Sequence, residues 1–114
     1  MIEELIKNLI NLDLTFIGEA PIGENNCQWI KATSGTTTVH FDKGNYDRPA
    51  YSIYFRGESN EECSNRCKQA FKRVRNYTDA RSALIATRMP SFVGKDDKHR
   101  SVYVFQIEYQ TGGY

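Results

Sequence analysis

Two cysteines four residues apart are the first candidates for chemistry in this chain. Cys63 and Cys67 lie in the stretch "SNEECSNRCKQAF", and Cys27 is the third cysteine. A zinc site would need further ligands, which Cys27 with His40 or His99 could supply, whereas structural zinc usually uses tight Cys knuckles in turns. An odd number of cysteines in a chain of this size also argues against a disulfide framework. We therefore expect reduced thiols and no metal ion.

The spacing of the cysteine pair fits a buried helix face better than a reactive site. Ser59 followed by Glu62 is a capping-box pattern, which predicts a helix start at residues 59–60. One arc of about 120° on this helix holds its apolar side chains: Cys63, Cys67, Ala70, Phe71, Val74 and Tyr77. Free cysteine packs as a small hydrophobe. We interpret the pair as packing residues of an amphipathic helix at about 60–77, with metal binding and redox chemistry as the weaker alternatives.

The remaining candidates for catalysis fit surface roles. His40 lies in a Thr-rich stretch and His99 in a charged turn, and neither has a motif that would orient it for nucleophilic catalysis. Asp96 and Asp97 stand side by side in "GKDDKHR", where aspartate is a common turn former. No glycine-rich stretch has the spacing of a phosphate-binding loop. We predict no enzymatic activity, no catalytic residue and no cofactor.

The composition is that of an ordinary globular domain. The chain has 114 residues, of which 39% are hydrophobic and 25% charged, and its formal net charge is +1. A single domain over residues 1–114 is expected from this length, and the charge balance gives no general attraction to nucleic acid or an anionic membrane. Glu3 and Glu4 stand where a signal peptide would be basic. We expect a product made in the cytoplasm, with no membrane segment.

Periodicity predicts the other elements. The stretch "IEELIKNLINL", residues 2–12, has apolar residues at helical spacing. Strands are predicted at 14–17, 27–33, 36–41, 51–57, 82–90 and 101–110. The last two form an antiparallel hairpin with "KDDKHR" at its tip, and residues 111–114 are a flexible tail. Together these predict an α+β fold, in which a single, mostly antiparallel sheet of about four to six strands carries both helices on one face.

Two surfaces remain open to function. The sheet face with Tyr54 and Arg56, opposite the predicted helices, is either solvated or meets a partner, and tyrosine is favoured at protein contacts. The stretch "KQAFKRVR" could contact phosphates, although a solvated helix face explains it more simply. Its candidate basic face is Lys68, Lys72, Arg73 and Arg75. The corresponding alternative function is a small nucleic-acid-binding α+β module.

The layout of four segments resembles a known family. A start like "IEELIKNLI", the strand "RPAYSIYFRGES", the helix "NEECSNRCKQAFKRV" and the end "MPSFVGKDDKHRSVYVFQIEY" resemble the tail terminator (tail-completion) proteins of long-tailed bacteriophages, often labelled phage minor capsid proteins. The stretch "SGTTTVHFDKGNYD" is not part of this likeness. The resemblance implies a structural protein of the virion tail, at the interface between head and tail.

In detail, the resemblance implies a homohexameric ring at the head-proximal end of the tail tube. Such a ring ends tube polymerisation and joins the tail tube protein to the head-completion or stopper protein, while genome DNA passes through the lumen without sequence recognition. We expect the contacts at Arg48–Tyr51 and Asp96–Arg100 and on the outer sheet face. The candidate contact residues are Arg48, Tyr51, Tyr54, Arg56, Lys95, Asp96, Asp97, Lys98, His99 and Arg100.

Overall fold

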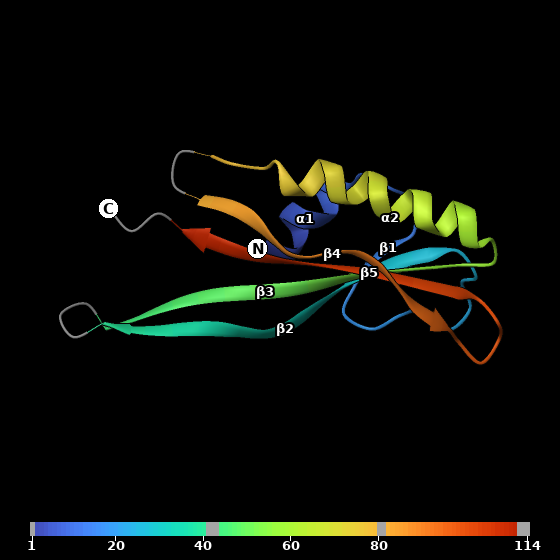
Figure 1. The fold of residues 1–114 in the computed structure, drawn as a ribbon, viewed down its shortest axis with the longest axis horizontal. Coiled ribbons are helices and arrows are strands. Elements are labelled where there is room, and N and C mark those ends of the chain that lie inside the picture. The colour runs from blue at the N-terminus through green and yellow to red at the C-terminus, as the bar shows by residue number, and fades with distance from the viewer. Residues whose placement is uncertain (1, 41–43, 80–81, 112–114) are drawn as a thin grey trace.

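The protein is one sheet with two helices on it. The computed structural model describes residues 2–40, 44–79 and 82–111 (Figure 1). In chain order the elements are α1 (Ile2–Ile10), β1 (Thr15–Ile17), β2 (Cys27–His40), β3 (Gly44–Gly57), α2 (Asn60–Arg75), β4 (Ser82–Lys95) and β5 (Ser101–Thr111). This confirms the predicted α+β fold. Of the predicted flexible tail, residues 112–114 lie outside the described residues.

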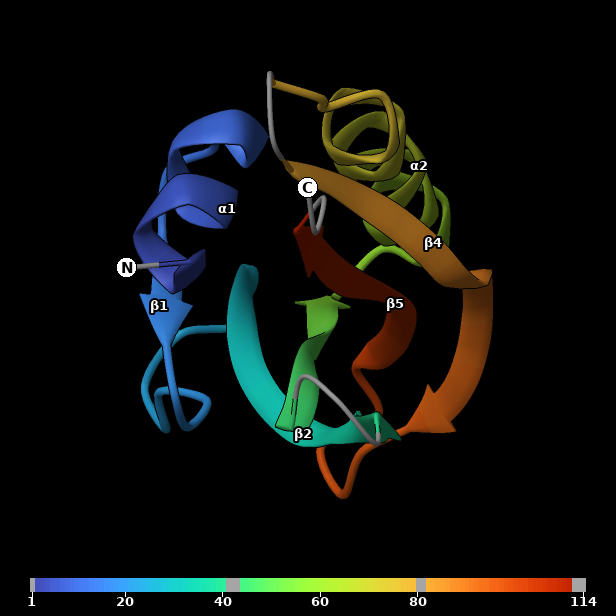
Figure 2. The ribbon, with the colours of Figure 1, turned by 90° about the vertical axis from the view of Figure 1, so that its left-hand side faces the viewer.

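The strands form a five-stranded sheet in the order β1-β2-β3-β5-β4. β1 runs parallel to β2, and the other neighbouring pairs are antiparallel, so the sheet is mixed rather than wholly antiparallel. Seen end-on, β1 and β4 lie on opposite sides of the molecule (Figure 2). They are the two edge strands.

Both helices begin where the sequence predicted, and each ends two residues earlier than predicted, at Ile10 and Arg75. In α2 the side chain of Ser59 accepts a hydrogen bond from the backbone N–H of Glu62, as the capping pattern predicted. α1 stops at Ile10 rather than at residue 12, because Asn11 adopts a left-handed φ of 50°. Asparagine is one of the few residues that tolerate this conformation at a helix end.

The core lies between the helices and the sheet. α2 packs on β3, β4 and β5, and it also contacts α1. The ring of Phe71 on α2 meets Phe105 on β5 edge-on, with their centroids 5.3 Å apart, and Phe105 stacks on Phe55 of β3. Cys63 and Cys67 are fully buried in this cluster, which confirms that the pair serves packing.

Three strands run well beyond their predicted bounds. Residues 44–50, which lie outside the predicted strands, belong to β3. The predicted segments 27–33 and 36–41 are joined in one strand, β2, which ends at His40 and has a register shift between Thr33 and Thr36; residue 41 lies outside the described residues. β4 runs through Pro90 to Lys95 instead of ending at Pro90. Proline is tolerated there because β4 is an edge strand whose pairing shifts register around it.

The distal halves of β2 and β3 form a ribbon of two strands. β3 pairs with β5 only from Ala50 onward, so Gly44–Pro49 have β2 as their neighbour in the sheet. This ribbon projects from the body at the left of Figure 1. The molecule is accordingly elongated, with extents of 51 × 25 × 21 Å.

Candidate assembly surfaces

The buried thiols offer no reactive site. Cys27, Cys63 and Cys67 are free and inaccessible. Burial, together with the nearby Cys63, raises the pKa of the Cys67 thiol to about 12, so the nucleophilic thiolate is disfavoured. Within the described ranges no three His, Cys, Asp or Glu side chains gather as metal ligands. No helix among the described residues is long and apolar enough to cross a membrane.

Two of the predicted contact residues are buried arginines that hold the connection between β1 and β2. Arg56 is 7% exposed and donates hydrogen bonds to the backbone oxygens of Pro21, at 2.6 Å, and Glu24. Its guanidinium lies 5.5 Å from the ring centroid of Trp29. Arg100 is 6% exposed and also donates to the Glu24 oxygen. These arginines therefore fix the loop at residues 18–26 against the sheet and leave little surface of their own for a partner.

The paired aspartates form a turn. The Asp96 carboxylate accepts hydrogen bonds from the backbone N–H groups of Lys98 and Arg100 and, at 2.8 Å, from Nε of Arg100. Burial acts to raise the pKa of Asp96, but the bonds from Arg100 and Lys98 outweigh it and lower the pKa. Asp97 is exposed beside it. This geometry closes the β4–β5 hairpin at the predicted position and serves as a turn.

The other predicted contact residues differ in exposure. Tyr51 is 5% exposed and belongs to the core. Tyr54 is half-buried and stacks on Trp29, with the ring centroids 5.2 Å apart. The side chain of Arg48 lies outside the described residues. Exposed members of the set are Lys95, Asp97, Lys98 and His99.

All four residues of the basic face are exposed, and one of them, Arg73, also has a structural contact. Nη1 of Arg73 donates a 2.6 Å hydrogen bond to the backbone oxygen of Ile10, at the C-terminal end of α1, where a cation is favoured. The other three residues border a groove of about 270 Å³ between α2 and β4, called here the α2–β4 groove. Its lining residues are Lys68, Phe71, Lys72, Arg75, Met89 and Pro90.

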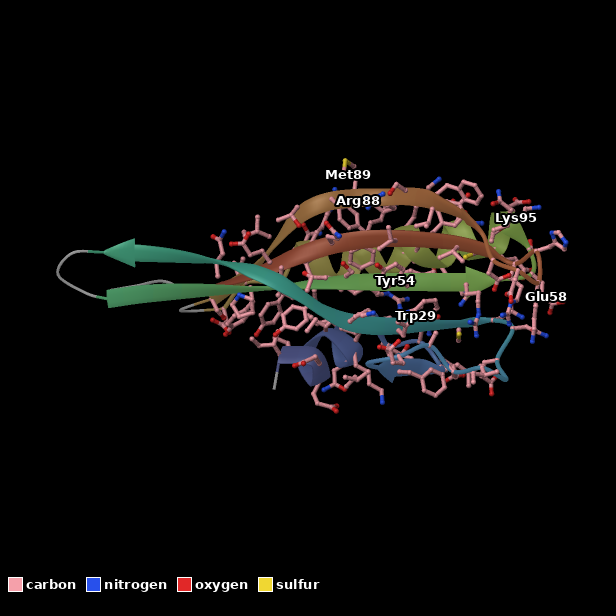
Figure 3. The ribbon with its side chains drawn as sticks, turned by 90° about the horizontal axis from the view of Figure 1, so that it is seen from below. Trp29, Tyr54, Glu58, Arg88, Met89 and Lys95 are labelled. Carbon is pink, nitrogen blue, oxygen red and sulfur yellow. The ribbon has the colours of Figure 1, made fainter. Side chains whose placement is uncertain are left out.

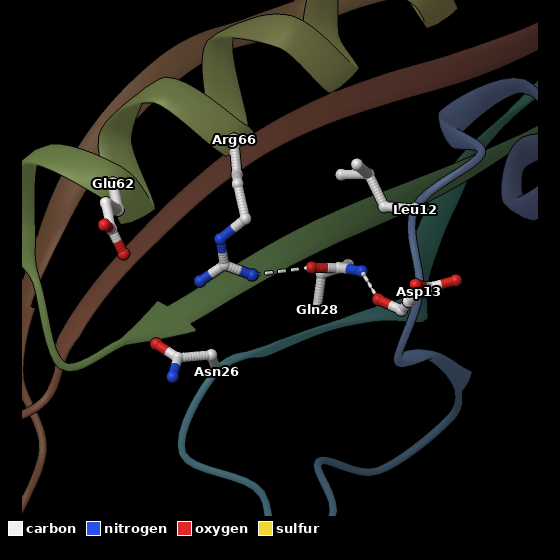
Figure 4. A pocket seen from close by; sticks show the side chains of 6 residues that line it. All are labelled: Leu12, Asp13, Asn26, Gln28, Glu62 and Arg66. Carbon is white, nitrogen blue, oxygen red and sulfur yellow. Dashed lines mark hydrogen bonds between the residues drawn. The ribbon is translucent and has the colours of Figure 1, made fainter.

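A second hollow, of about 550 Å³, lies between the start of α2, β2 and the segment after α1 (Figure 4). Arg66 donates a 2.8 Å hydrogen bond to Oε1 of Gln28, whose Nε2 in turn donates to the backbone oxygen of Asp13. The same Nε2 donates to Oγ1 of Thr15. These polar groups are hydrogen-bonded to one another, so we interpret the hollow as the place where α2 is fixed to the sheet.

The exposed apolar side chains lie at opposite edges of the sheet. Seven large hydrophobic residues are exposed among those described: Leu14, Ile17, Ile22, Ile85, Met89, Phe92 and Val93. The first three belong to β1 and the segments flanking it, and the other four belong to β4. Figure 3 shows Arg88 and Met89 on β4 along one edge, with β1 along the opposite edge. We call these the β1 edge and the β4 edge.

Sequence reasoning did not single out any of these seven residues. Ile22 stands in "APIGE", between a proline and a glycine, where it belongs to no helical or alternating pattern. An apolar residue in such a loop is a usable signal for an exposed contact. On β4 we found no such signal, because the exposed Ile85 and Met89 lie in the same predicted strand as the buried Leu84.

Searches for relatives found no match, either to a family model or to a curated protein.

Proposed function

We propose that this protein is a tail terminator: a structural protein of the virion that forms a hexameric ring at the head-proximal end of a phage tail tube. The ring ends tube polymerisation and joins the tube protein to the head-completion or stopper protein. DNA passes through its lumen without being read. The proposal starts from the resemblance of four sequence segments to that family.

The observation that carries the proposal is the placement of exposed apolar side chains at two opposite sheet edges. A ring of identical subunits needs heterologous contacts, in which one surface of a subunit meets a different surface of the next. Two separate apolar edges on one chain fit this requirement. A symmetric dimer would instead need one self-complementary patch.

The projecting β2–β3 ribbon supports the same proposal. An isolated pair of strands is at best marginally stable in water, so a partner surface would stabilise it. Within a ring, such a ribbon would reach a neighbouring subunit, the tube or the stopper protein.

The experiment combines the purified protein with tail tube protein from the same phage. Tube growth followed by light scattering should stop when about one hexamer per tube is present, and negative-stain images should show a ring on one tube end. Unchanged tube lengths, with a strict monomer at high concentration, would contradict the proposal. Monomers that assemble only on the tube end would agree with it.

The second candidate function is nucleic-acid binding through the exposed Lys68, Lys72 and Arg75. Three phosphate contacts would give a slope of about −2.7 in log K against log salt on duplex DNA. That slope, without any effect on tubes, would favour this function over the ring.

A further inference from the structure

We infer that the β1 edge of one copy docks into the α2–β4 groove of the next copy, with Ile22 as the inserted side chain. This inference rests on the proposed ring and names the contact that builds it. The occupant of the groove is thus a second copy of this chain.

The β1 edge combines apolar and acidic residues. Residues 13–26 contain three acids, Asp13, Glu19 and Glu24, and no lysine or arginine. Ile22 is 87% exposed, the highest value among the exposed large hydrophobics of the described chain. The backbone oxygens of Pro21 and Glu24, on either side of it, are held by Arg56. A loop fixed in this way presents Ile22 at little cost in conformational entropy.

Glu19, three residues before Ile22, remains available for a partner. Oε1 of Glu19 lies 3.7 Å from Nζ of Lys31, and the two side chains are 86% and 50% exposed. An exposed ion pair of this kind contributes little to stability. Glu19 can therefore exchange Lys31 for a cation of another copy.

The groove combines apolar and basic residues. Phe71, Met89 and Pro90 form its apolar part. Lys68, Lys72 and Arg75 border it, and β4 adds Arg88 and Lys95 while containing no acidic residue. Acidic-apolar and basic-apolar surfaces on opposite edges of one chain are complementary to each other. Complementary charge of this kind selects the partner and fixes its orientation.

The contact is made by side chains and does not add a strand to the sheet. β4 contains Pro90, which lacks an N–H donor, and its pairing with β5 shifts register at three places. Such features block edge-to-edge strand pairing. The opposing strand β1 has only three residues. A side chain inserted into a groove fits both edges better than a shared ladder.

A cysteine pair tests the contact directly. The variant Ile22→Cys/Met89→Cys carries one new thiol on each edge, whereas the three native thiols are buried. With a short bismaleimide, this variant should form a ladder of covalent multimers, both alone at high concentration and on tail tubes. The matched control is Glu61→Cys/Met89→Cys, since Glu61 is exposed on α2 and belongs neither to the groove lining nor to the β1 edge. Equal crosslinking in the control would overturn the inference.

Charge reversal tests the orientation. Glu19→Lys and Lys72→Glu should each weaken self-association or tube capping by about tenfold, and combining them should restore most of it. Lys98→Glu, in the β4–β5 turn, should have little effect. If Lys98→Glu weakened self-association or capping while Lys72→Glu did not, the contact would lie at the β4–β5 turn, and the proposed groove contact would be wrong.

The outcomes separate this contact from the ring proposal. Capping of tubes without the Ile22–Met89 crosslink would overturn the contact and leave the tail terminator function standing. The crosslinked ladder without any effect on tubes would establish the contact and overturn that function.

Discussion

Nη1 of Arg66 on α2 lies 2.8 Å from Oε1 of Gln28 on β2, and its Nη2 donates a 2.6 Å hydrogen bond to the backbone oxygen of Arg56 on β3. Nε2 of Gln28 in turn donates a hydrogen bond to Oγ1 of Thr15 on β1. One arginine therefore ties the second helix to two strands directly and to an edge strand through an amide. The backbone oxygen that it reaches belongs to the residue before Gly57.

Gly57→Ala should destabilise the protein by about 1–3 kcal/mol, because the added methyl would overpack this joint. A Cβ there would lie 2.8 Å from Nη2 of Arg66 and 3.2 Å from Cβ of Cys63. Urea unfolding followed by circular dichroism measures the loss. Gly23→Ala is the matched control, since a Cβ at Gly23 meets nothing within 4 Å. Equal stability of the two variants would contradict the close approach.

Arg66→Met should cost about 1–3 kcal/mol, because it leaves the buried Gln28 oxygen without its donor. Methionine retains much of the apolar stem, so the loss reports the hydrogen bonds. The control is Lys68→Met on the exposed side of the same helix, which should change stability by less than about 0.5 kcal/mol. Thermal unfolding of both variants measures this difference. Unchanged stability of Arg66→Met would show that these hydrogen bonds do not stabilise the fold.

Cys63→Ala together with Cys67→Ala should lower the free energy of unfolding by about 2 kcal/mol, the scale for removing small buried groups. Both side chains are fully buried in the core, away from the two edges. Urea midpoints give the loss in stability. The proposed assembly on tail tubes should be unchanged, and an assembly defect in a folded double variant would point to a role beyond packing.

Stability should fall as the pH rises from about 9 to about 12, in part because of Cys67. Its pKa is raised by burial from 9.0 to about 12, so the unfolded chain loses this proton at lower pH than the folded chain does. In that window the folded state binds more protons, and alkali therefore favours unfolding. The decline should be shallower in Cys67→Ala. Because the pKa of Tyr51 is also raised by burial, some decline should remain in the variant.

Asp96→Asn should reduce stability near neutral pH and lose this effect in strong acid. The Asp96 pKa is lowered in the folded protein, so its contribution is present above the unfolded value of about 3.9 and disappears as the pH falls through the folded pKa. The unfolding midpoints of wild type and variant should converge in strong acid, below the folded pKa of Asp96. Asp97→Asn, at the exposed neighbour, should match wild type at both pH values.

Local signals were enough to predict α2, its capped start and its buried face, because a helix is specified by residues within a few positions of one another. The hairpin tip at Asp96–Arg100 was predictable for the same reason. The full length of β2 and β3 was not, since their distal halves are polar and pair only with each other. Pro90 predicted the end of a strand. Because β4 is an edge strand, it accommodates the proline and continues past it.

The exposure of the β4 edge could not be predicted, because it depends on the order of strands in the sheet. Met89 was predicted as an ordinary strand residue, and its exposure follows from the placement of β4 at the edge of the sheet. Similarly, the sequence predicted Arg56 as a surface cation. Its burial could not be predicted, because it depends on a loop that lies more than thirty positions earlier in the chain.

Because all three free cysteines are buried, the folded protein protects its thiols from oxidation. With exposures of 0%, Cys27, Cys63 and Cys67 offer no sulfur to an oxidant or to a reducing agent while the fold is intact. These three thiols should therefore stay reduced in the folded protein, whether its surroundings are reducing or oxidising. In the proposed virion, no disulfide would then have to form or break when the particle leaves the reducing interior of a cell.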